Sequence, residues 1–231
     1  VHDLKQPIQA IGNALEPGRR ALAQYDFEKA RSMFELAASA TQLMREQLTG
    51  VLEISRLESG FVSAELSTFD LVPLIEDVFS QLANFARRHD VLLRSGTLPG
   101  PVIVFGDRHF MGRILLNLVS NGIKYHDPER PGQRWVEVRL TLRGDAVLIT
   151  IEDNGVGIEE TLISSEAIFK PFFQVDNRHR ESEKGVGLGL SIVQAMLALM
   201  PEHRLSVCSQ VGAGTCMTLH APRGRPGHRP P

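Results

Sequence analysis

The sequence predicts an α+β protein in two parts, an N-terminal antiparallel helical hairpin followed by an α/β sandwich. Across residues 1–60, apolar side chains recur every three or four positions and strand signals are almost absent, which is typical of amphipathic helices. From residue 68, short runs of alternating apolar residues are interleaved with further helical patterns. Two glycine clusters interrupt this second part, at residues 153–158 and 185–190. We therefore expect a helical domain at 1–66, an α/β domain at 67–221 and a tail at 222–231.

Composition limits the class of protein. Of the 231 residues, 42% are hydrophobic and 23% are charged, which is ordinary for a soluble globular chain. The net charge of −2 argues against a general nucleic-acid binder. The sequence has no signal peptide and no apolar run of the ~18 residues that a membrane span needs. We expect no nucleic-acid partner and no membrane contact for this fragment, which begins with Val1 and is interpreted as a piece of a longer protein.

The cysteines and histidines show no metal-binding spacing. Cys208 and Cys216 are predicted to be free buried thiols, because neither secretory context nor metal-ligand spacing accompanies them. The eight histidines form no pair with zinc-ligand spacing, which argues against a zinc site.

Two long helices are predicted before residue 60. The first covers residues 1–15, where Leu4, Ile8, Ile11 and Leu15 share one face, and Glu16-Pro17-Gly18 weakens or ends it. The second covers residues 26–59, with Asp26 as its N-cap and Gly60 as its stop. Two helices that each bury one stripe cannot close a core alone, so a homodimer forming a four-helix bundle is predicted. The alternative is a two-helix appendage packed on its own globular domain.

The α/β part is predicted element by element from periodicity and turn residues. The expected helices cover residues 72–88, residues 108–125 with Asp107 as the cap, and the stretch from the second glycine cluster to about 200. Single strands are expected at 69–71, 91–98 and 102–105. Two antiparallel hairpins are expected, one of 135–142 and 146–151 around the turn 143–145, and one of 205–208 and 215–219 across 212–214. The tail at 222–231 is rich in Pro, Gly and Arg and is predicted to be a disordered end or linker.

The glycine clusters indicate a ligand site. The first, Asp-Asn-Gly-Val-Gly-Ile at 153–158, follows a strand pattern, and the second, Gly-Val-Gly-Leu-Gly-Leu at 185–190, opens a helix. Glycine lets a backbone approach a ligand, and a helix N-terminus offers unpaired N–H groups to an anion. A single cluster is more often a tight strand-to-helix turn. Two clusters joined by a polar stretch favour a nucleotide held beneath a mobile flap.

A polar stripe on the predicted helix 108–125 adds a second indication. Asn117, Asn121 and Lys124 are spaced by four and three, so they share one helix face. Amide oxygens are hard ligands suited to Mg²⁺, and a lysine ammonium suits phosphate oxygens. For this helix alone, a solvated polar face is an equal alternative.

Together these motifs resemble the ATP-binding domain of sensor histidine kinases, a fold of the Bergerat type shared with gyrase, MutL and a heat-shock chaperone. The resemblance covers about residues 68–221 and implies ATP and Mg²⁺ as ligands, with Asn121 as the main Mg²⁺ ligand, Asn117 assisting and Asp153 accepting the adenine amino group. It implies a lid at 159–184 that includes the phenylalanine box 168–173. The residues of that box themselves favour hinge packing over a ligand contact. The residues implied at the ATP site are Asn117, Asn121, Lys124, Tyr125, Asp153, Gly155, Gly157, Ile158, Phe169, Lys184, Gly185, Val186, Gly187, Leu188, Gly189, Leu190 and Thr215.

The start of the chain distinguishes a kinase from the other ATPases. Residues 1–8, Val-His-Asp-Leu-Lys-Gln-Pro-Ile, resemble the phosphoacceptor box of the dimerisation helix. A neutral imidazole is a nucleophile near pH 7, so His2 can attack a γ-phosphate while Asp3 holds or takes a proton. The resemblance implies autophosphorylation of His2 and phosphoryl transfer to an aspartate of a response-regulator receiver domain, in a cytoplasmic fragment of a parent that can be membrane-anchored. Gln6 replaces the family's usual Thr or Asn, which puts phosphatase activity in doubt.

Two other classes of function fit the motifs less well. A signalling scaffold without catalysis would show degraded glycine or asparagine motifs, and none is degraded here. A conformational ATPase would need a catalytic acid near the start of helix 108–125, where His109 and Arg113 stand instead. A weaker hypothesis, from residues 173–176 and the tail, is a hybrid kinase with a receiver domain further along the chain.

Overall fold

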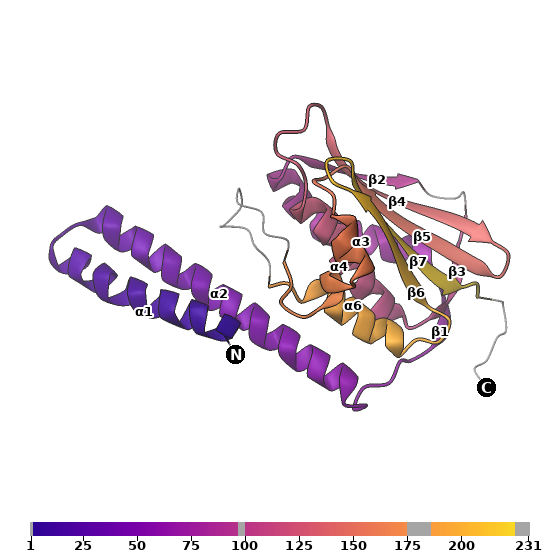
Figure 1. The fold of residues 1–231 in the computed structure, drawn as a ribbon, viewed down its shortest axis with the longest axis horizontal. Coiled ribbons are helices and arrows are strands. Elements are labelled where there is room, and N and C mark those ends of the chain that lie inside the picture. Colours follow the sequence, from indigo (N-terminus) through magenta and orange to yellow (C-terminus); the bar gives the residue numbers. More distant parts are fainter. Residues whose placement is uncertain (1, 97–99, 175–185, 225–231) are drawn as a thin grey trace.

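The computed structural model describes residues 2–96, 100–174 and 186–224, with side chains from Pro7 onward. A two-helix hairpin projects from an α/β domain, and the second half of its longer helix runs along that domain (Figure 1). The predicted α+β class, with the helices first and the sheet after, is confirmed. No helix in the described ranges has the length and apolar character needed to cross a membrane.

The hairpin consists of α1 (His2–Ala23) and α2 (Phe27–Glu58). Asp26 caps α2 as predicted, since its side chain accepts a hydrogen bond from Lys29 N. The predicted end of the first helix at residues 16–18 is wrong, because α1 continues through Pro17. A Cβ placed on Gly18 would lie 3.2 Å from Met33 Cβ, so this glycine lets the two helices pack closely. That packing offsets the ~3 kcal/mol that an interior proline costs a helix.

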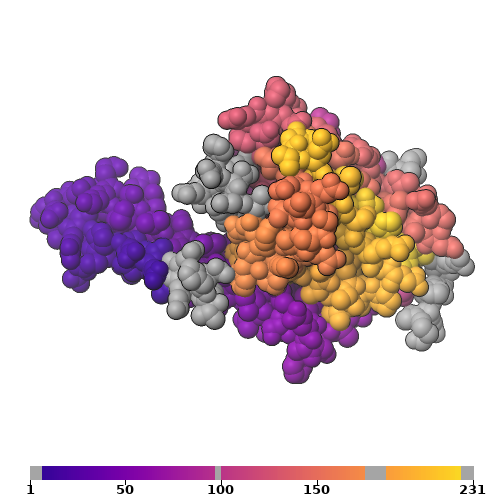
Figure 2. Space-filling model, viewed as in Figure 1, coloured from indigo at the N-terminus to yellow at the C-terminus, as the bar shows by residue number. Residues whose placement is uncertain are grey.

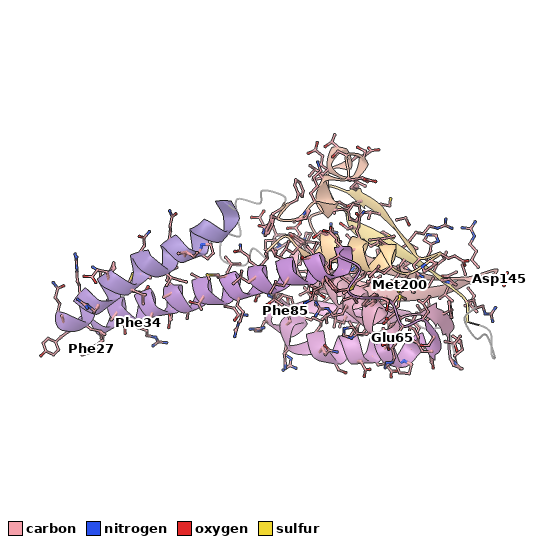
Figure 3. The ribbon with its side chains drawn as sticks, turned by 90° about the horizontal axis from the view of Figure 1, so that it is seen from below. Phe27, Phe34, Glu65, Phe85, Asp145 and Met200 are labelled. Carbon is pink, nitrogen blue, oxygen red and sulfur yellow. The ribbon has the colours of Figure 1, made fainter. Side chains whose placement is uncertain are left out.

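Small residues form the buried contact between the two helices, while larger apolar residues face solvent. The buried alanines are Ala14, Ala21, Ala30, Ala37 and Ala40. The exposed apolar side chains of the hairpin include Ile8, Leu15, Leu22, Phe34, Leu36, Leu48 and Leu52. Phe27 and Phe34 lie toward the tip that is farthest from the α/β domain (Figure 3). The hairpin therefore carries an apolar surface that the described part of the chain leaves exposed.

A five-stranded sheet forms the frame of the second part. Its strand order is β2-β4-β5-β7-β6, with β2 parallel to β4 and the other neighbours antiparallel. The strands are β2 (Val91–Gly96), β4 (Arg134–Arg143), β5 (Ala146–Asp153), β6 (Arg204–Gln210) and β7 (Gly214–Pro222). A separate antiparallel pair is formed by β1 (Ser67–Asp70) and β3 (Ile103–Gly106). Both predicted hairpins are confirmed, and Gly144 adopts the positive φ of +61° that the first turn requires.

Three helices cover one face of this sheet and bury the core between them and the strands. They are α3 (Leu71–Arg88), α4 (Arg108–Lys124) and α6 (Gly189–Ala198) (Figure 1). Ile114 and Leu115 of α4 are completely buried, as is Ile149 of β5. Two short helices, α5 (Glu160–Ser164) and η1 (Ala167–Phe169), lie between β5 and α6 in the sequence. No helix within residues 2–96, 100–174 and 186–224 covers the opposite face of the sheet.

The first residues of the predicted tail belong to the fold. Pro222 is the last residue of β7. Arg223 N donates to Asp145 O at 2.8 Å, and Gly224 N donates to Ile103 O at 3.0 Å. The prediction of a disordered segment is therefore wrong for these three residues, because backbone pairing with β3 and with the β4–β5 turn continues past β7. Residues 225–231, the rest of the predicted tail, lie outside the described part, and the domain limits at 66 and 67 stay a prediction.

Asp107 fixes the start of α4, and its replacement measures how much this cap contributes to the free energy of unfolding. Its Oδ1 accepts from His109 N at 2.8 Å and Phe110 N at 3.0 Å, and its Oδ2 accepts from Glu65 N at 2.8 Å. Because Asp107 is only 5% exposed, Asp107→Ala leaves one buried and two partly buried backbone donors without this partner. We expect it to lower the free energy of unfolding by about 3 kcal/mol in urea denaturation.

The matched control is Asp26→Ala, which removes an exposed cap with a single bond from Lys29 N. It should cost about 1 kcal/mol or less. Equal losses for the two variants would contradict the role assigned to Asp107.

Candidate functional site

An apolar pocket opens between α4 and the ends of β5 and β7. Its cavity volume is about 80 Å³. The floor comes from the strands, where Asp153 is the register partner of Thr215 and Ile151 is the partner of Met217. The remaining lining comes from α4, the first glycine cluster and the segments around α6: Leu118, Asn121, Gly122, Tyr125, Val156, Gly157, Ile158, Ile168, Phe173, Gln174 and Leu190. The lining is mostly apolar with a few polar groups, which is typical of ligand pockets.

Asp153 is the ionisable group on the pocket floor. Its Oδ1 accepts from Gly155 N at 2.8 Å and from Thr215 N at 3.3 Å. Burial raises the pKa of this carboxyl from its ordinary 3.8 to about 6, although the two backbone donors oppose the rise. Burial also raises the pKa of Tyr125, which keeps its hydroxyl protonated. Because both bonds engage Oδ1, Oδ2 is the carboxylate oxygen that a ligand in the pocket can reach.

The first glycine cluster is wedged between α4 and the β6–β7 hairpin. A Cβ on Gly155 would overlap the carbonyl oxygen of Tyr125, and a Cβ on Gly157 would overlap that of Gln210. Gly157 also has a φ of +73°, which disfavours any other residue. Val156 N donates to Tyr125 O at 3.0 Å and thereby ties the loop to the end of α4. Gly155 therefore acts by packing, and Gly157 both packs and lines the pocket.

A wider groove continues from the pocket along α4. Its cavity volume is about 590 Å³, and its lining includes Asn117, Asn121, Lys124 and the segment 186–190. Asn117 Nδ2 donates to Arg113 O at 3.0 Å, which orients the amide so that Oδ1 lies 3.0 Å from where a Cβ on Gly189 would stand. Helix α6 begins at that glycine. Two amides, a lysine and the N-terminus of α6 thus converge, which is a donor set suited to a hydrated divalent cation and an anion.

Helix α2 forms the other wall of this groove, so the hairpin packs in part on its own globular domain, as the alternative interpretation of the sequence allowed. Arg45, Glu46, Thr49, Gly50 and Glu53 line it from α2. The carboxylate of Glu53 pairs with the guanidinium of Arg113 in α4 at 2.6 Å. Gly50 leaves room for Leu188, because a Cβ at residue 50 would lie only 2.5 Å from Leu188 Cδ1. A glycine inside a long helix was the one available signal of this close approach.

Most predicted site residues come together around the pocket and the groove, with four groups of exceptions. Phe169 lies in a separate groove against Leu57 of α2 and Gln194 of α6, while its neighbours Ile168 and Phe173 line the pocket. Gly155 packs beneath the pocket. Lys184 and Gly185 lie outside the described residues. His2 and Asp3 begin α1, but their side chains are outside the described part.

The pocket also contains residues that the sequence analysis missed. Leu118, Ile151 and Met217 line it. The sequence pattern could have predicted two of them, because alternate residues of a strand share a face. Ile151 lies two residues from Asp153, and Met217 lies two residues from Thr215.

The fold and the site define a nucleotide-binding domain, and comparisons with known proteins identify its family. The family described as histidine kinase-, DNA gyrase B-, and HSP90-like ATPase matches residues 106–225, more than half of the chain. The chain therefore belongs to this ATPase family, which binds ATP.

Similar proteins cover the helical hairpin as well. The hybrid signal transduction protein dokA of Dictyostelium discoideum is 35% identical over 86% of this chain and 12% of its own length. Sensor histidine kinase AtsR of Burkholderia thailandensis is 28% identical over 98% of this chain and 36% of its own length. The solved histidine kinase AdeS of Acinetobacter baumannii has the same fold, with a TM-score of 0.70 and 18% identity over 97% of this chain and 99% of that one. The chain spans about a third or less of these two curated relatives.

The buried carboxylate of Asp153 should make the stability of the domain depend on pH. A raised carboxyl pKa means that the folded state holds the proton more tightly than the unfolded chain, so ionisation costs stability as the pH rises from about 4 through 6. One pKa unit corresponds to ~1.4 kcal/mol. Asp153→Asn keeps an acceptor for Gly155 N and Thr215 N without the charge. We expect it to be more stable than the wild type by up to ~3 kcal/mol above pH 7.

Urea denaturation of both proteins at pH 4.5 and pH 8 measures this difference. The gap should be widest at pH 8 and shrink at pH 4.5. A gap that stays constant with pH would show that Asp153 titrates as an ordinary carboxyl.

Proposed function

We propose that this chain is the core of a sensor histidine kinase that transfers the γ-phosphate of ATP to His2 and then to an aspartate of a response-regulator receiver domain. The observation that carries the proposal is the continuity of the apolar pocket, the polar groove of α4 and the wall of α2. A nucleotide in the first two would direct its phosphates toward the helical hairpin that contains the histidine. The kinship with AtsR, a sensor histidine kinase, supports this activity over the others in the family.

At the base end, the adenine ring would occupy the apolar pocket. Asp153 Oδ2 would accept the amino group, while Oδ1 stays held by Gly155 N and Thr215 N. Ile158, Leu190 and Tyr125 would cover the ring, since all three line the pocket. Because an ionised carboxylate accepts a hydrogen bond more strongly than a protonated carboxyl, the pKa of about 6 at Asp153 supports tighter binding of ATP above pH 6 than below it.

At the phosphate end, Asn121 and Asn117 would hold Mg²⁺, and Lys124 would contact phosphate oxygens. The metal, when bound, neutralises negative charge on the phosphates. The N–H groups at the start of α6, around Leu188 to Leu190, are oriented by the helix to stabilise anionic oxygens. In such a site the protein acts mainly by positioning and by charge, because the transition state of phosphoryl transfer is loose.

The geometry of the hairpin supports His2 as the acceptor. The turn between α1 and α2 lies at residues 24–26, and both helices rise ~1.5 Å per residue. The first turn of α1 therefore lies level with the middle of α2, at about Arg45 to Thr49 (Figure 1). Those α2 residues also line the groove. A displacement of the ATP-binding domain along α2 would then bring phosphate and imidazole together, with Asp3 orienting the ring.

The exposed apolar surface of the hairpin supports a homodimer. Ile8, Leu15 and Leu22 are each more than 40% exposed and follow one another at intervals of seven residues. A seven-residue spacing is typical of helix bundles. A second copy of the chain would cover this seam and complete a four-helix bundle. We place the chain in the cytoplasm, because that is the compartment of receiver domains. Kinship with the hybrid protein dokA supports a receiver domain in the same polypeptide.

Replacement of His2 tests the acceptor directly. We expect His2→Ala to abolish incorporation of acid-labile phosphate from labelled ATP, because no imidazole remains at the head of α1, while ATP binding stays unchanged. His220→Ala, on the open face of β7, is the control and should be labelled like the wild type. Labelling of the His2 variant at the wild-type level would refute the assignment.

Replacement of Asn121 tests the metal end of the site. Asn121→Ala should weaken Mg²⁺-dependent nucleotide binding by at least about tenfold, since it removes the oxygen ligand nearest the junction of pocket and groove. Nucleotide affinity measured with and without Mg²⁺ separates this loss from a loss of base binding. Asn84→Ala, an exposed asparagine in α3, is the matched control. If both variants bind Mg·ATP equally well, Asn121 is not the ligand.

A further inference from the structure

We propose that Cys208 and Cys216 form a redox-active pair that closes to a disulfide by exchange with a small-molecule disulfide, and that this closure weakens ATP binding. The effect on ATP rests on the proposed nucleotide site, whereas formation of the bond does not. The pair lies on the β6–β7 hairpin, at the edge of the sheet (Figure 1).

Strand register places the two cysteines directly opposite each other. Cys208 of β6 and Cys216 of β7 are partners in the antiparallel pairing, so their side chains project from the same face of the sheet. Opposed residues of antiparallel strands have Cα atoms about 4.5 or 5.5 Å apart. A disulfide spans Cα separations of roughly 4.4–6.8 Å. The spacing of the two strands therefore already lies within the range that a disulfide bridges, and closure fixes that spacing at this pair of positions.

Both thiols are accessible, contrary to the prediction of buried ones. Cys208 is exposed and Cys216 is partly exposed. That prediction followed from the lack of secretory context and of metal-ligand spacing, but both cysteines stand on the sheet face that no helix of the described ranges covers. The C-terminal residues, drawn in yellow, form part of the surface in the space-filling view (Figure 2). Since β6 is the last strand of the sheet, a small disulfide can approach Cys208 from the open side.

The surroundings give the two thiols different roles. Partial burial raises the pKa of Cys216, and the carboxylate of Glu152, its register partner on β5, acts in the same direction. Arg139 on β4 opposes this effect and is itself paired with Glu152. The exposed Cys208 is therefore the first nucleophile, and Cys216 is the resolving thiol.

The reaction is a two-step exchange with a disulfide such as oxidised glutathione. The thiolate of Cys208 attacks one sulfur of the small disulfide, a mixed disulfide forms and one small thiolate leaves. The thiolate of Cys216 then attacks Sγ of Cys208 and releases the second small thiolate. Two protein thiols lose two electrons and two protons, and the small disulfide gains them as two thiols.

A chain of hydrogen bonds connects the pair to the ATP pocket. The next residues on the two strands are Ser209 and Thr215, whose hydroxyls lie 2.9 Å apart. Ser209 Oγ accepts from Ile158 N at 2.8 Å, and Thr215 N donates to Asp153 Oδ1. A disulfide one residue away would fix the spacing and the twist of the two strands, and we expect this constraint to disturb both bonds. Because Ile158 and Asp153 line the pocket, closure should lower affinity for the base.

The first measurement is the bond itself, on the full chain. After incubation with oxidised glutathione, we expect the wild type to lose two titratable thiols and about 2 Da of mass, with Cys208 and Cys216 joined in the non-reduced peptide map. Cys208→Ser should remain unjoined, and Cys216→Ser should stop at the glutathione adduct on Cys208. A wild type that yields only glutathione adducts or only disulfides between two chains would overturn the proposal.

The second measurement is the affinity of a fluorescent ATP analogue before and after oxidation. We expect about fivefold or greater weakening in the oxidised wild type, reversed by dithiothreitol, and no change in the double variant Cys208→Ser/Cys216→Ser. An oxidised protein with unchanged affinity, or one that has unfolded by circular dichroism, would overturn the coupling. Failure of the reduced wild type to bind ATP would instead refute the proposed function, because the disulfide would still be seen by mass.

Discussion

The two hydrogen bonds to Asp153 Oδ1 are the constraint on which the site depends. Gly155 N comes from the loop after β5 and Thr215 N comes from β7, so one buried oxygen joins two segments distant in sequence. The loop can reach this position only because glycines at 155 and 157 meet the carbonyls of Tyr125 and Gln210 without a side chain. Burial makes the ionised carboxylate costly, with a pKa of about 6. The fold thus keeps an unfavourable charge on the floor of a pocket where a ligand can use it.

Helix α4 connects the pocket to the helical hairpin. Asn121 and Asn117 lie on the face that lines the groove, and Arg113, one turn earlier, pairs with Glu53 of α2. The side-chain amide of Asn117 is itself oriented by the carbonyl of Arg113. The contact between the two parts of the chain is therefore built into the same helix that would hold the metal. Any movement of the ATP-binding domain along α2 has to break the Glu53–Arg113 pair and withdraw Leu188 from Gly50.

Local patterns predicted the elements and much of the site, and the failures have physical causes. Periodicity located α2, α3 and α4 because each buries one apolar face, and Asp26 and Asp107 marked helix starts through their capping chemistry. Pro17 led to a wrong end for α1. A sequence pattern shows the cost of a proline inside a helix, but it does not show the close packing at Gly18 that offsets this cost. The wall that α2 contributes to the groove depends on how two parts of the chain dock. Whether Cys208 and Cys216 lie opposite each other depends on the strand register. That register is set by the length of the β6–β7 loop, which the structure shows.

The sheet separates two kinds of chemistry between its faces. Side chains at alternate positions of β7 point to the helices, where Thr215 and Met217 line the pocket, or to the open face, where Cys216 and Thr218 stand. A change on the open face cannot touch a nucleotide directly. It can act only through the backbone, and the backbone next to Cys216 is the N–H of Thr215 that fixes Asp153. A small shift of an edge hairpin therefore reaches the most constrained atom of the site, because that atom takes half of its support from β7.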